Sequence, residues 1–240
     1  MAGETLRVAT FNLKHGAPQT EYKGDPDLVV QACTDLNADI IALQEVDVRV
    51  IRSRFANLAQ VVAKATGMEA LFSPTMRYGT GFYGNALLIN GEVESSQTLD
   101  LGSGRRHRLQ FAGRSIDIGH EPRNAIVTHA TVRGRRLTLA ATHLALEKAL
   151  SKRQLAQTVD ALVQSDDPQI LLGDFNLTRS LVTRECLVDP FVLAQGPPTI
   201  PADHPKRQID HIAVNGLTIN HVEALHMPIS DHRALVAEVE

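Results

Sequence analysis

Two stretches of this sequence share one plan, in which a strand ends at a polar residue, a helix follows, and a second strand ends at a carboxylate. The polar residues are Asn12 and Glu45 in the first stretch, and His143 and Asp174 in the second. The intervals are 33 and 31 residues, each the size of a strand–helix–strand unit. Because such crossovers are right-handed, both strand ends of a unit lie on one edge of a sheet. Two units packed sheet to sheet would bring these four side chains and Asn176 into one cleft.

The second stretch ends in the most informative strand of the chain. Residues 170–172 are apolar and uncharged, which is typical of a buried strand, and Asp174 and Asn176 follow two residues apart. Alternation along a strand lets both side chains point the same way, at the edge where open α/β sheets build their sites. A carboxylate with a carboxamide suits holding a water molecule beside an anion. The alternative is a strand end followed by an Asx-turn.

Apolar periodicity predicts the remaining elements. Helices are expected at residues 26–36, 55–66 and 147–164, with Phe55 facing the core in the second. Residues 79–84 are expected to form a flexible loop, and Asn90-Gly91 and Asn215-Gly216 are typical of tight turns that send a strand back along its neighbour. No linker divides the chain, so we expect one domain over residues 1–240. Strands are expected at residues 6–13, 40–43, 71–72, 86–89, 93–101, 111–118, 125–132, 137–143, 208–214, 217–225 and 234–239.

Composition limits the possible functions. A chain of 240 residues can bury a full core, and its net charge of −3 argues against a general nucleic-acid binder without excluding a local basic face. With no tryptophan and few other aromatic residues, a base-stacking surface is not expected. Cys33 and Cys186 lie far apart and fit a reduced protein. Residues 1–8 lack a signal-peptide pattern and no stretch is suited to crossing a bilayer, so we expect a cytoplasmic protein.

Polar residues at the ends of predicted strands are the candidates for chemistry. Taken singly, each has a structural explanation, such as a helix cap or a surface pair. Taken together, they are hard to explain as accidents. The set comprises Asn12, Glu45, Asn85, His143, Asp174, Asn176, Asp210, Asp231 and His232.

These residues lie in motifs that resemble the endonuclease/exonuclease/phosphatase family, also called the DNase I-like family. The motifs occur in the family's order and extend over almost the whole chain. The resemblance implies an α/β fold, a two-sheet β-sandwich flanked by helices in four layers. The motifs are Thr10-Phe11-Asn12-Leu13, Leu43-Gln44-Glu45-Val46-Asp47, Gly84-Asn85-Ala86, Thr142-His143-Leu144, Gly173-Asp174-Phe175-Asn176, Ile209-Asp210-His211-Ile212 and Ser230-Asp231-His232.

The resemblance also implies hydrolysis of phosphoesters with Mg²⁺ or Mn²⁺. Glu45 would be the principal metal ligand with Asn12 and Asp231 beside it, a set of oxygen ligands that agrees with Mg²⁺. Asp210 would orient His232, while Asp174 and Asn176 would position or activate the attacking water. His143 would contact the phosphate or assist the leaving group, and Asn85 and Arg123 would be further phosphate contacts. Whether Asp174 or His232 is the base, and whether one or two metals bind, stays open.

One position departs from the DNase pattern. Nucleases that resemble DNase I carry an acidic residue near the position of Asn85, paired with the equivalent of His143. Abasic-site nucleases lack that histidine altogether, whereas this chain keeps it. The chain therefore looks more like the short bacterial members of unassigned substrate, and a carboxylate-supported His143 is not expected.

Three hypotheses follow. The first is a monomeric metal-dependent phosphodiesterase or phosphatase, with a small or headgroup substrate favoured over a nucleic acid. The second is a sequence-tolerant nuclease whose basic turns contact phosphates. The third is an inactive binding module on the same fold. His129 imitates the Thr-His-Leu motif in mid-strand and is interpreted as structural. Asp47, Arg49 and Arg52 are interpreted as an ion-paired loop, with a substrate rim as the alternative. The basic turns contain Arg105, Arg106, Arg108, Arg133, Arg135 and Arg136.

Overall fold

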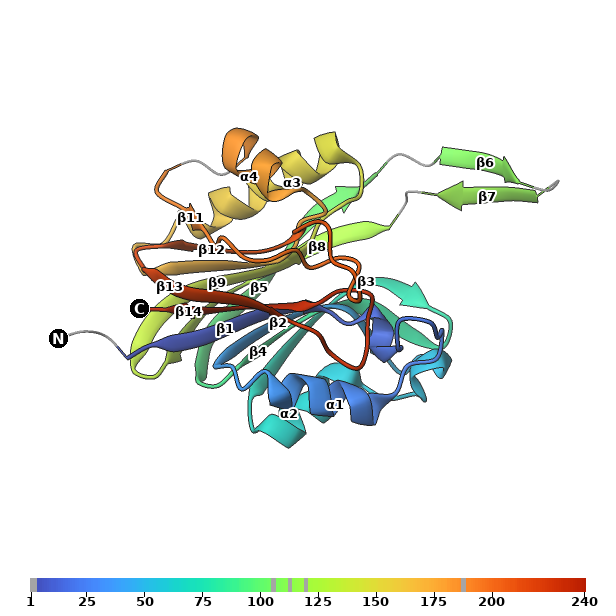
Figure 1. Ribbon diagram of the computed structural model, residues 1–240, viewed down its shortest axis with the longest axis horizontal. Helices are drawn as coiled ribbons and strands as arrows, with labels where there is room; N and C mark the ends of the chain where they lie inside the picture. Colours follow the sequence, from blue (N-terminus) through green and yellow to red (C-terminus); the bar gives the residue numbers. More distant parts are fainter. Residues whose placement is uncertain (1–3, 105–106, 112–113, 119–120, 187–188) are drawn as a thin grey trace.

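Two six-stranded sheets pack face to face in a computed structural model of the chain, which describes residues 4–104, 107–111, 114–118, 121–186 and 189–240 (Figure 1). The first sheet runs from edge to edge through β13 (Ile219–Leu225), β14 (Ala234–Val239), β1 (Leu6–Asn12), β2 (Ile40–Val48), β4 (Gly81–Ile89) and β3 (Glu69–Tyr78). The second runs through β11 (Val192–Leu193), β12 (Asp210–Asn215), β10 (Gln169–Asp174), β9 (Arg135–His143), β8 (Pro122–Val132) and β5 (Glu92–Ser103).

Helices cover the outer face of each sheet and complete the four predicted layers (Figure 1). The first sheet carries α1 (Pro26–Asp35) and α2 (Leu58–Thr66), and the second carries α3 (Lys148–Leu162) and α4 (Arg179–Glu185). Short 3-10 turns span Lys14–Gly16 and Ile51–Ser53. None of the helices in the described part of the chain has the length and apolar character needed to cross a membrane.

The two predicted strand–helix–strand units are confirmed. In the first sheet β1 and β2 are parallel neighbours joined through α1, and in the second β9 and β10 are parallel neighbours joined through α3. The register places Asn12 opposite Gln44 and Asp174 opposite His143. Both units therefore deliver their polar strand ends to the same edge of the sandwich.

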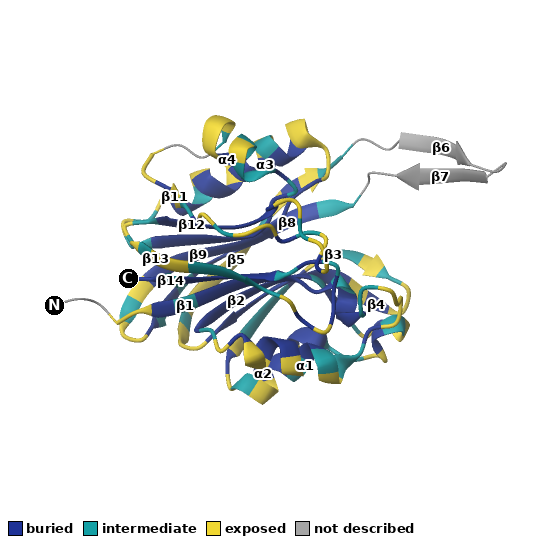
Figure 2. Ribbon diagram, viewed as in Figure 1, coloured by how far each residue is buried: buried dark blue, intermediate teal, exposed yellow. Residues whose placement is uncertain are grey.

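The central strands are buried on both faces because apolar layers form between the sheets and under the helices, whereas β3, β5 and β13 are largely half-buried or exposed (Figure 2). All six residues of β10 are buried. Ile170 and Leu172 enter the cluster between the sheets, whereas Leu171 enters the cluster under α3 and α4, as expected for side chains that alternate along a strand. This double burial explains why the sequence there is a continuous apolar run.

The helix predicted to begin at Phe55 begins at Leu58. Asn57 is its N-cap, because its side-chain oxygen accepts a hydrogen bond of 3.2 Å from the backbone N–H of Gln60. Gly67 ends the helix in the left-handed conformation. Phe55 lies outside it with 56% of its surface exposed, so the prediction that it faces the core was wrong.

Both Asn-Gly dipeptides were wrongly predicted to return a strand along its neighbour. Asn90-Gly91 connects β4 of the first sheet to β5 of the second, and Asn215-Gly216 connects β12 of the second sheet to β13 of the first. Both edges of β4 are already paired, by β2 and β3, so the following strand has to leave that sheet. Local turn chemistry marked the position of each turn but not the sheet that the chain enters next.

Three further expectations need correction. Residues 71–72 form the middle of a longer strand, and residues 81–84 belong to β4 and not to a loop. Gly81 and Gly84 are needed there because a Cβ atom would lie about 2 Å from the carbonyl oxygens of Val48 and Ser73 respectively. Residues 111–118 are not one strand, since β6 (His107–Phe111) and β7 (Arg114–Ile118) pair as a separate two-stranded ribbon. Arg105, Arg106 and the side chain of Arg108 lie outside the described residues.

Candidate active site

Asn12 joins the two sheets at the edge where their polar strand ends meet. It is the last residue of β1 and is buried, and its Nδ2 atom donates to Glu45 Oε1 at 3.0 Å and to Asp174 Oδ2 at 3.1 Å. Its Oδ1 accepts from the backbone N–H of Lys14 at 3.1 Å. One amide group thus contacts a carboxylate from each strand–helix–strand unit, as the matching plan of the two units predicted.

Glu45 lies at an irregularity inside β2 and not at its end. Pairing with β4 shifts register between Leu43 and Val46, and Glu45 has a φ of 59°, in the left-handed region. Such a conformation costs a non-glycine residue on the order of 1 kcal/mol or more and recurs at functional sites. The bulge turns the carboxylate toward Asn12 while the strand continues to Val48.

Asp174 uses its two oxygens for different purposes. Its Oδ1 accepts from the backbone N–H of Asn176 at 2.9 Å, which is the Asx-turn alternative raised from the sequence. Its Oδ2 faces the cleft, 3.6 Å from His143 Nε2 and 3.9 Å from His232 Nε2. Asn176, with a φ of 53°, donates its side-chain amide to the carbonyl of Leu144 at 2.9 Å. The turn and the site therefore coexist, and Asn176 holds the loop that follows His143.

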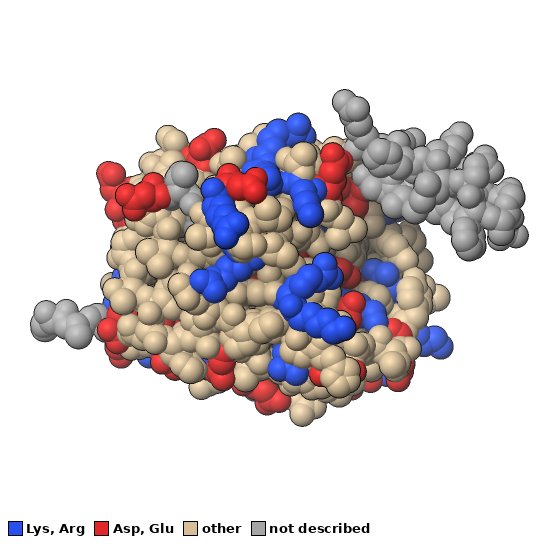
Figure 3. Space-filling model, turned by 45° about the horizontal axis from the view of Figure 1, so that its top comes forward, with Lys and Arg blue, Asp and Glu red and all other residues tan. Residues whose placement is uncertain are grey.

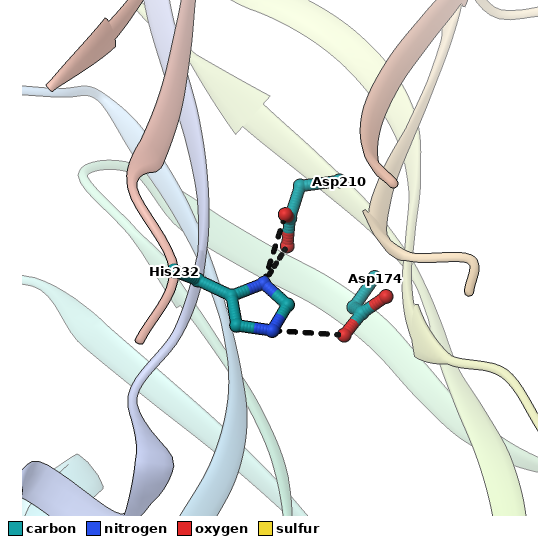
Figure 4. A group of neighbouring side chains, drawn as sticks. All are labelled: Asp174, Asp210 and His232. Carbon is teal, nitrogen blue, oxygen red and sulfur yellow. Dashed lines mark hydrogen bonds and ion pairs between the residues drawn. The ribbon is translucent and has the colours of Figure 1, made fainter. Parts of the chain in front are cut away.

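The imidazole of His232 lies between two carboxylates (Figure 4). Its Nδ1 atom is 2.9 Å from Asp210 Oδ2 and 3.2 Å from Oδ1, and its Nε2 atom points toward Asp174. Ser230 orders this segment, since its hydroxyl donates to the carbonyl of Asn12 at 2.6 Å and accepts from the backbone N–H of His232 at 3.0 Å. The predicted orientation of His232 by Asp210 is compatible with this geometry.

Burial and charge shift the pKa values of these groups. Burial, reinforced by the charge of Asp210, raises the pKa of Asp174 to about 7. Burial alone would lower the pKa of His232, but the charge and hydrogen bond of Asp210 outweigh it and raise that pKa to about 10. At neutral pH, His232 is therefore an imidazolium, whereas Asp174 is divided between its carboxylate and its protonated form.

His143 has the opposite character. It is buried, and burial together with the positive charges of Arg123 and His232 holds its pKa well below the usual value. Its imidazole is therefore neutral at neutral pH and can both donate and accept one hydrogen bond. Asp174 Oδ2 lies 3.6 Å from His143 Nε2, which is too far for a hydrogen bond and agrees with the expectation that no carboxylate supports His143.

Asn85 and Arg123 belong to a neighbouring buried polar group. Asn85 Nδ2 donates to Asn124 Oδ1 at 2.9 Å, and Arg123 donates to Glu121 Oε1 at 2.7 Å. Sequence reasoning missed Asn124 and Glu121, although both flank Arg123 at the start of β8. Burial raises the pKa of Glu121, and the positive charge of Arg123 opposes this rise.

Two sets of residues are candidates to hold a divalent cation. The predicted set is Glu45, Asn12 and Asp231, whose oxygen atoms are of the type that Mg²⁺ or Mn²⁺ prefers. Asn12 contacts Glu45 through its Nδ2 atom, whereas its Oδ1 accepts from the backbone N–H of Lys14, and the Asp231 charge acts on His232. The second set is Asp174, Asp210 and His232, whose ligand atoms all lie within 4.8 Å of one another. Because Asp210 and His232 already bond to each other, the second set is better suited to holding a proton.

Two further histidines form hydrogen bonds outside the candidate site. His129, which was interpreted as structural, pairs through Nδ1 with the hydroxyl of Thr138 at 3.0 Å. His211 Nε2 pairs with the carbonyl of Leu177 at 2.8 Å, while its Nδ1 is buried with no hydrogen-bond partner in the described part of the chain. The expected ion pair of the loop after Glu45 is present, with Arg52 bound through two nitrogens to the buried carboxylate of Asp47.

The chain belongs to the Endonuclease/Exonuclease/phosphatase family, whose sequence model matches residues 9–232. Among curated proteins, no significant match was found. The solved structures that resemble it include an endonuclease/exonuclease/phosphatase from Bacteroides vulgatus, with 19% identity, a TM-score of 0.72, and 99% of each chain covered.

Two further structures carry functional descriptions. A mannosyl-6-phosphatase from Bacteroides thetaiotaomicron shares 15% identity at a TM-score of 0.73, over 98% of this chain and 99% of that one. The human Nocturnin catalytic domain, which was solved with a bound sulfate anion, shares 20% identity at a TM-score of 0.66, over 98% and 94%. At these identities, the comparisons establish a shared fold.

Proposed function

We propose that this protein is a divalent-metal-dependent phosphoesterase, and specifically a phosphodiesterase that hydrolyses a P–O bond by in-line attack of water. The observation that carries the proposal is the surrounding of Asp174 Oδ2, which faces Asn12 at 3.1 Å, His143 at 3.6 Å and His232 at 3.9 Å. A carboxylate that is shared by an amide and two imidazoles at a sheet edge suits a water-positioning site.

Glu45 with Asn12 and Asp231 would hold the metal ion, which when bound supplies positive charge to the phosphate oxygens. Asp174 would orient the attacking water and accept its proton. His232, kept cationic by Asp210, would donate a hydrogen bond to a non-bridging oxygen as negative charge develops there. These roles make the Asp210–His232 pair a source of charge and leave Asp174 as the base.

The remaining predicted residues would act on the other side of the phosphate. His143, as a neutral imidazole, would donate a hydrogen bond to a phosphate or leaving-group oxygen. Arg123 would contact the phosphate from its buried position beside Glu121, and Asn85 would do so by donating an Nδ2–H, the group that bonds Asn124 in this structure. Asn176 would act indirectly, by holding the Leu144 carbonyl and the loop that follows His143.

The first test is hydrolysis of bis(p-nitrophenyl) phosphate beside p-nitrophenyl phosphate, with Mg²⁺ or Mn²⁺ and with chelator. We expect metal-dependent cleavage of the diester that falls by at least about 100-fold in Asp174→Asn, the loss typical of removing a catalytic proton acceptor. Asp35→Asn, at an exposed carboxylate near the end of α1, is the matched control. Preference for the monoester would reassign the enzyme as a phosphatase, and an unchanged rate in Asp174→Asn would remove the assigned base.

A further inference from the structure

A cavity of about 510 Å³ lies between α4 and residues 206–208. Its charged lining residues are Arg179, Arg184, Lys206 and Arg207, and none of the described residues that line it carries a carboxylate. Thr178 and Ser180 line the same cavity, and their hydroxyl groups are 3.2 Å apart. Figure 3 shows Lys and Arg side chains gathered in the middle of one face of the molecule, although the chain as a whole is slightly acidic.

The four cations of this cavity are not compensated within the described part of the chain. None of them forms an ion pair with a described carboxylate, whereas arginines elsewhere do, for example Arg52 with Asp47 and Arg123 with Glu121. Like charges that line one cavity repel each other, and an anion placed between them relieves this repulsion. Arginine also offers planar paired donors that match phosphate oxygens.

Both walls of the cavity continue directly into the candidate catalytic residues. Thr178 follows Asp174 by four residues, so their Cα atoms are at most ~14 Å apart. Arg207 precedes Asp210 by three residues, which limits that separation to ~11 Å. A group bound in the cavity would therefore lie within reach of the same substrate molecule as the phosphate at Asp174.

The wall that carries Lys206 and Arg207 is fixed to the segment of Asp231 and His232. Ile200 and Arg207 form an isolated antiparallel bridge, which closes the loop on itself. The backbone N–H of Ala202 donates to the carbonyl of Asp231 at 2.8 Å, and Arg233 Nε donates to the carbonyl of Ala202 at 2.7 Å. The cations are thereby held at a set position relative to the active site.

We propose that this cavity is a second phosphate site, which binds a phosphate group of the substrate other than the one that is cleaved. The substrate class is then a phosphoester with at least two phosphates, whether a small bisphosphate or a short nucleotide strand. Its role in substrate selection rests on the proposed phosphoesterase activity, whereas binding of phosphate in the cavity does not.

The test compares the affinities of ligands that differ in phosphate number, measured by isothermal titration calorimetry in chelator. The ligands are thymidine 5′-monophosphate, thymidine 3′,5′-bisphosphate and a 5′-phosphorylated tetrathymidylate. The variants are Arg184→Gln/Arg207→Gln, at two exposed residues, and Lys64→Gln on α2 as the matched control. Circular dichroism and thermal melting verify that each variant folds.

We expect at least one of the two longer ligands to bind the wild type and Lys64→Gln on the order of tenfold more tightly than the monophosphate, the gain of an added charge-assisted hydrogen bond. This preference should disappear in the double variant. A gain with the bisphosphate assigns a small substrate, and a gain with the strand alone assigns a nucleic acid. Equal affinities in the wild type, or a preference that persists in the double variant, would overturn the proposal.

Turnover is measured separately on wild-type protein. If the preference for additional phosphates is present but no diester or monoester is hydrolysed with metal, the proposed activity fails while the second phosphate site stands. If hydrolysis is present without the preference, the activity stands and the second site fails.

Discussion

The side-chain amide of Asn12, at the end of β1, donates a hydrogen bond of 3.1 Å to the carboxylate of Asp174, at the end of β10. The two residues belong to different sheets and are 162 positions apart in the chain. Their hydrogen bond links the two sheets at the edge where the candidate active site lies. The same amide also donates to Glu45, so one neutral group bonds a carboxylate on each sheet.

Replacing Asn12 with Asp should disrupt this arrangement through charge. A third carboxylate would lie within about 3 Å of Glu45 and Asp174, and the lost Nδ2 donor would leave both without their shared hydrogen bond. We expect diesterase activity to fall by at least 100-fold and the melting temperature to decrease. Asn37→Asp, at an exposed residue, controls for the added charge. Activity within twofold of the wild type would show that the Asn12 contact is dispensable.

His232 and His211 should have widely separated pKa values in metal-free protein. His232 should remain protonated up to about pH 10, whereas burial lowers the pKa of His211 to about 4. Because the folded pKa of His232 lies above its unfolded value of 6.5, its stabilising contribution is fully present below pH 6.5 and is lost as pH rises through about 10. Imidazole ¹⁵N NMR measures both values. Asp210→Asn should lower the His232 pKa, and an unchanged value would exclude Asp210 as the cause.

The Asp47–Arg52 ion pair should contribute to the stability of the fold. Asp47 is fully buried, and Arg52→Met would leave its carboxylate without the paired donors at 2.8 and 2.9 Å. We expect a loss of about 3–5 kcal/mol in the free energy of unfolding, measured in urea. The double variant Asp47→Asn/Arg52→Met should recover part of it, because no unpaired charge is then buried. A double variant no more stable than Arg52→Met would argue that packing of the arginine matters more than its charge.

The layer between the sheets can be tested with one truncation. Leu172 is fully buried in that layer, and Leu172→Ala should cost about 2–5 kcal/mol of stability. Leu146, with 77% of its surface exposed, provides the matched control, since Leu146→Ala should change stability by less than about 0.5 kcal/mol. Equal effects of the two truncations in thermal melts would contradict the assigned core.

The sequence predicted the parts of the fold that have a local signature. The two strand–helix–strand units were found because apolar runs ended at Asn12, Glu45, His143 and Asp174, and parallel pairing then requires these ends to share an edge. Whether two strands joined by an Asn-Gly turn become neighbours depends on edges already occupied by distant strands, as for β4. That information is not local, and both turns were therefore misassigned.

The candidate site was predictable in its residues but less so in its geometry. The left-handed φ of Glu45 arises from a bulge opposite β4, and the residue types in this segment do not predict that bulge. Asn124 and Glu121 were missed because neither follows an apolar run, although they bond the predicted contacts Asn85 and Arg123. The sequence also could not predict that one oxygen of Asp174 bonds the turn while the other faces the cleft, because the second contact comes from the other sheet.

The pairing of the first strand with the last strand of the chain has a consequence for folding. Leu6 on β1 pairs with Val239 on β14, so the first strand finds its antiparallel neighbour only through the far end of the chain. Pairings this distant in sequence are slow to form and leave strand edges open until late. The residues of the candidate site come from both ends and the middle of the chain, so neither half contains the whole set. Under the proposed function, hydrolysis would therefore require the closed sandwich, and partly folded chains would be inactive.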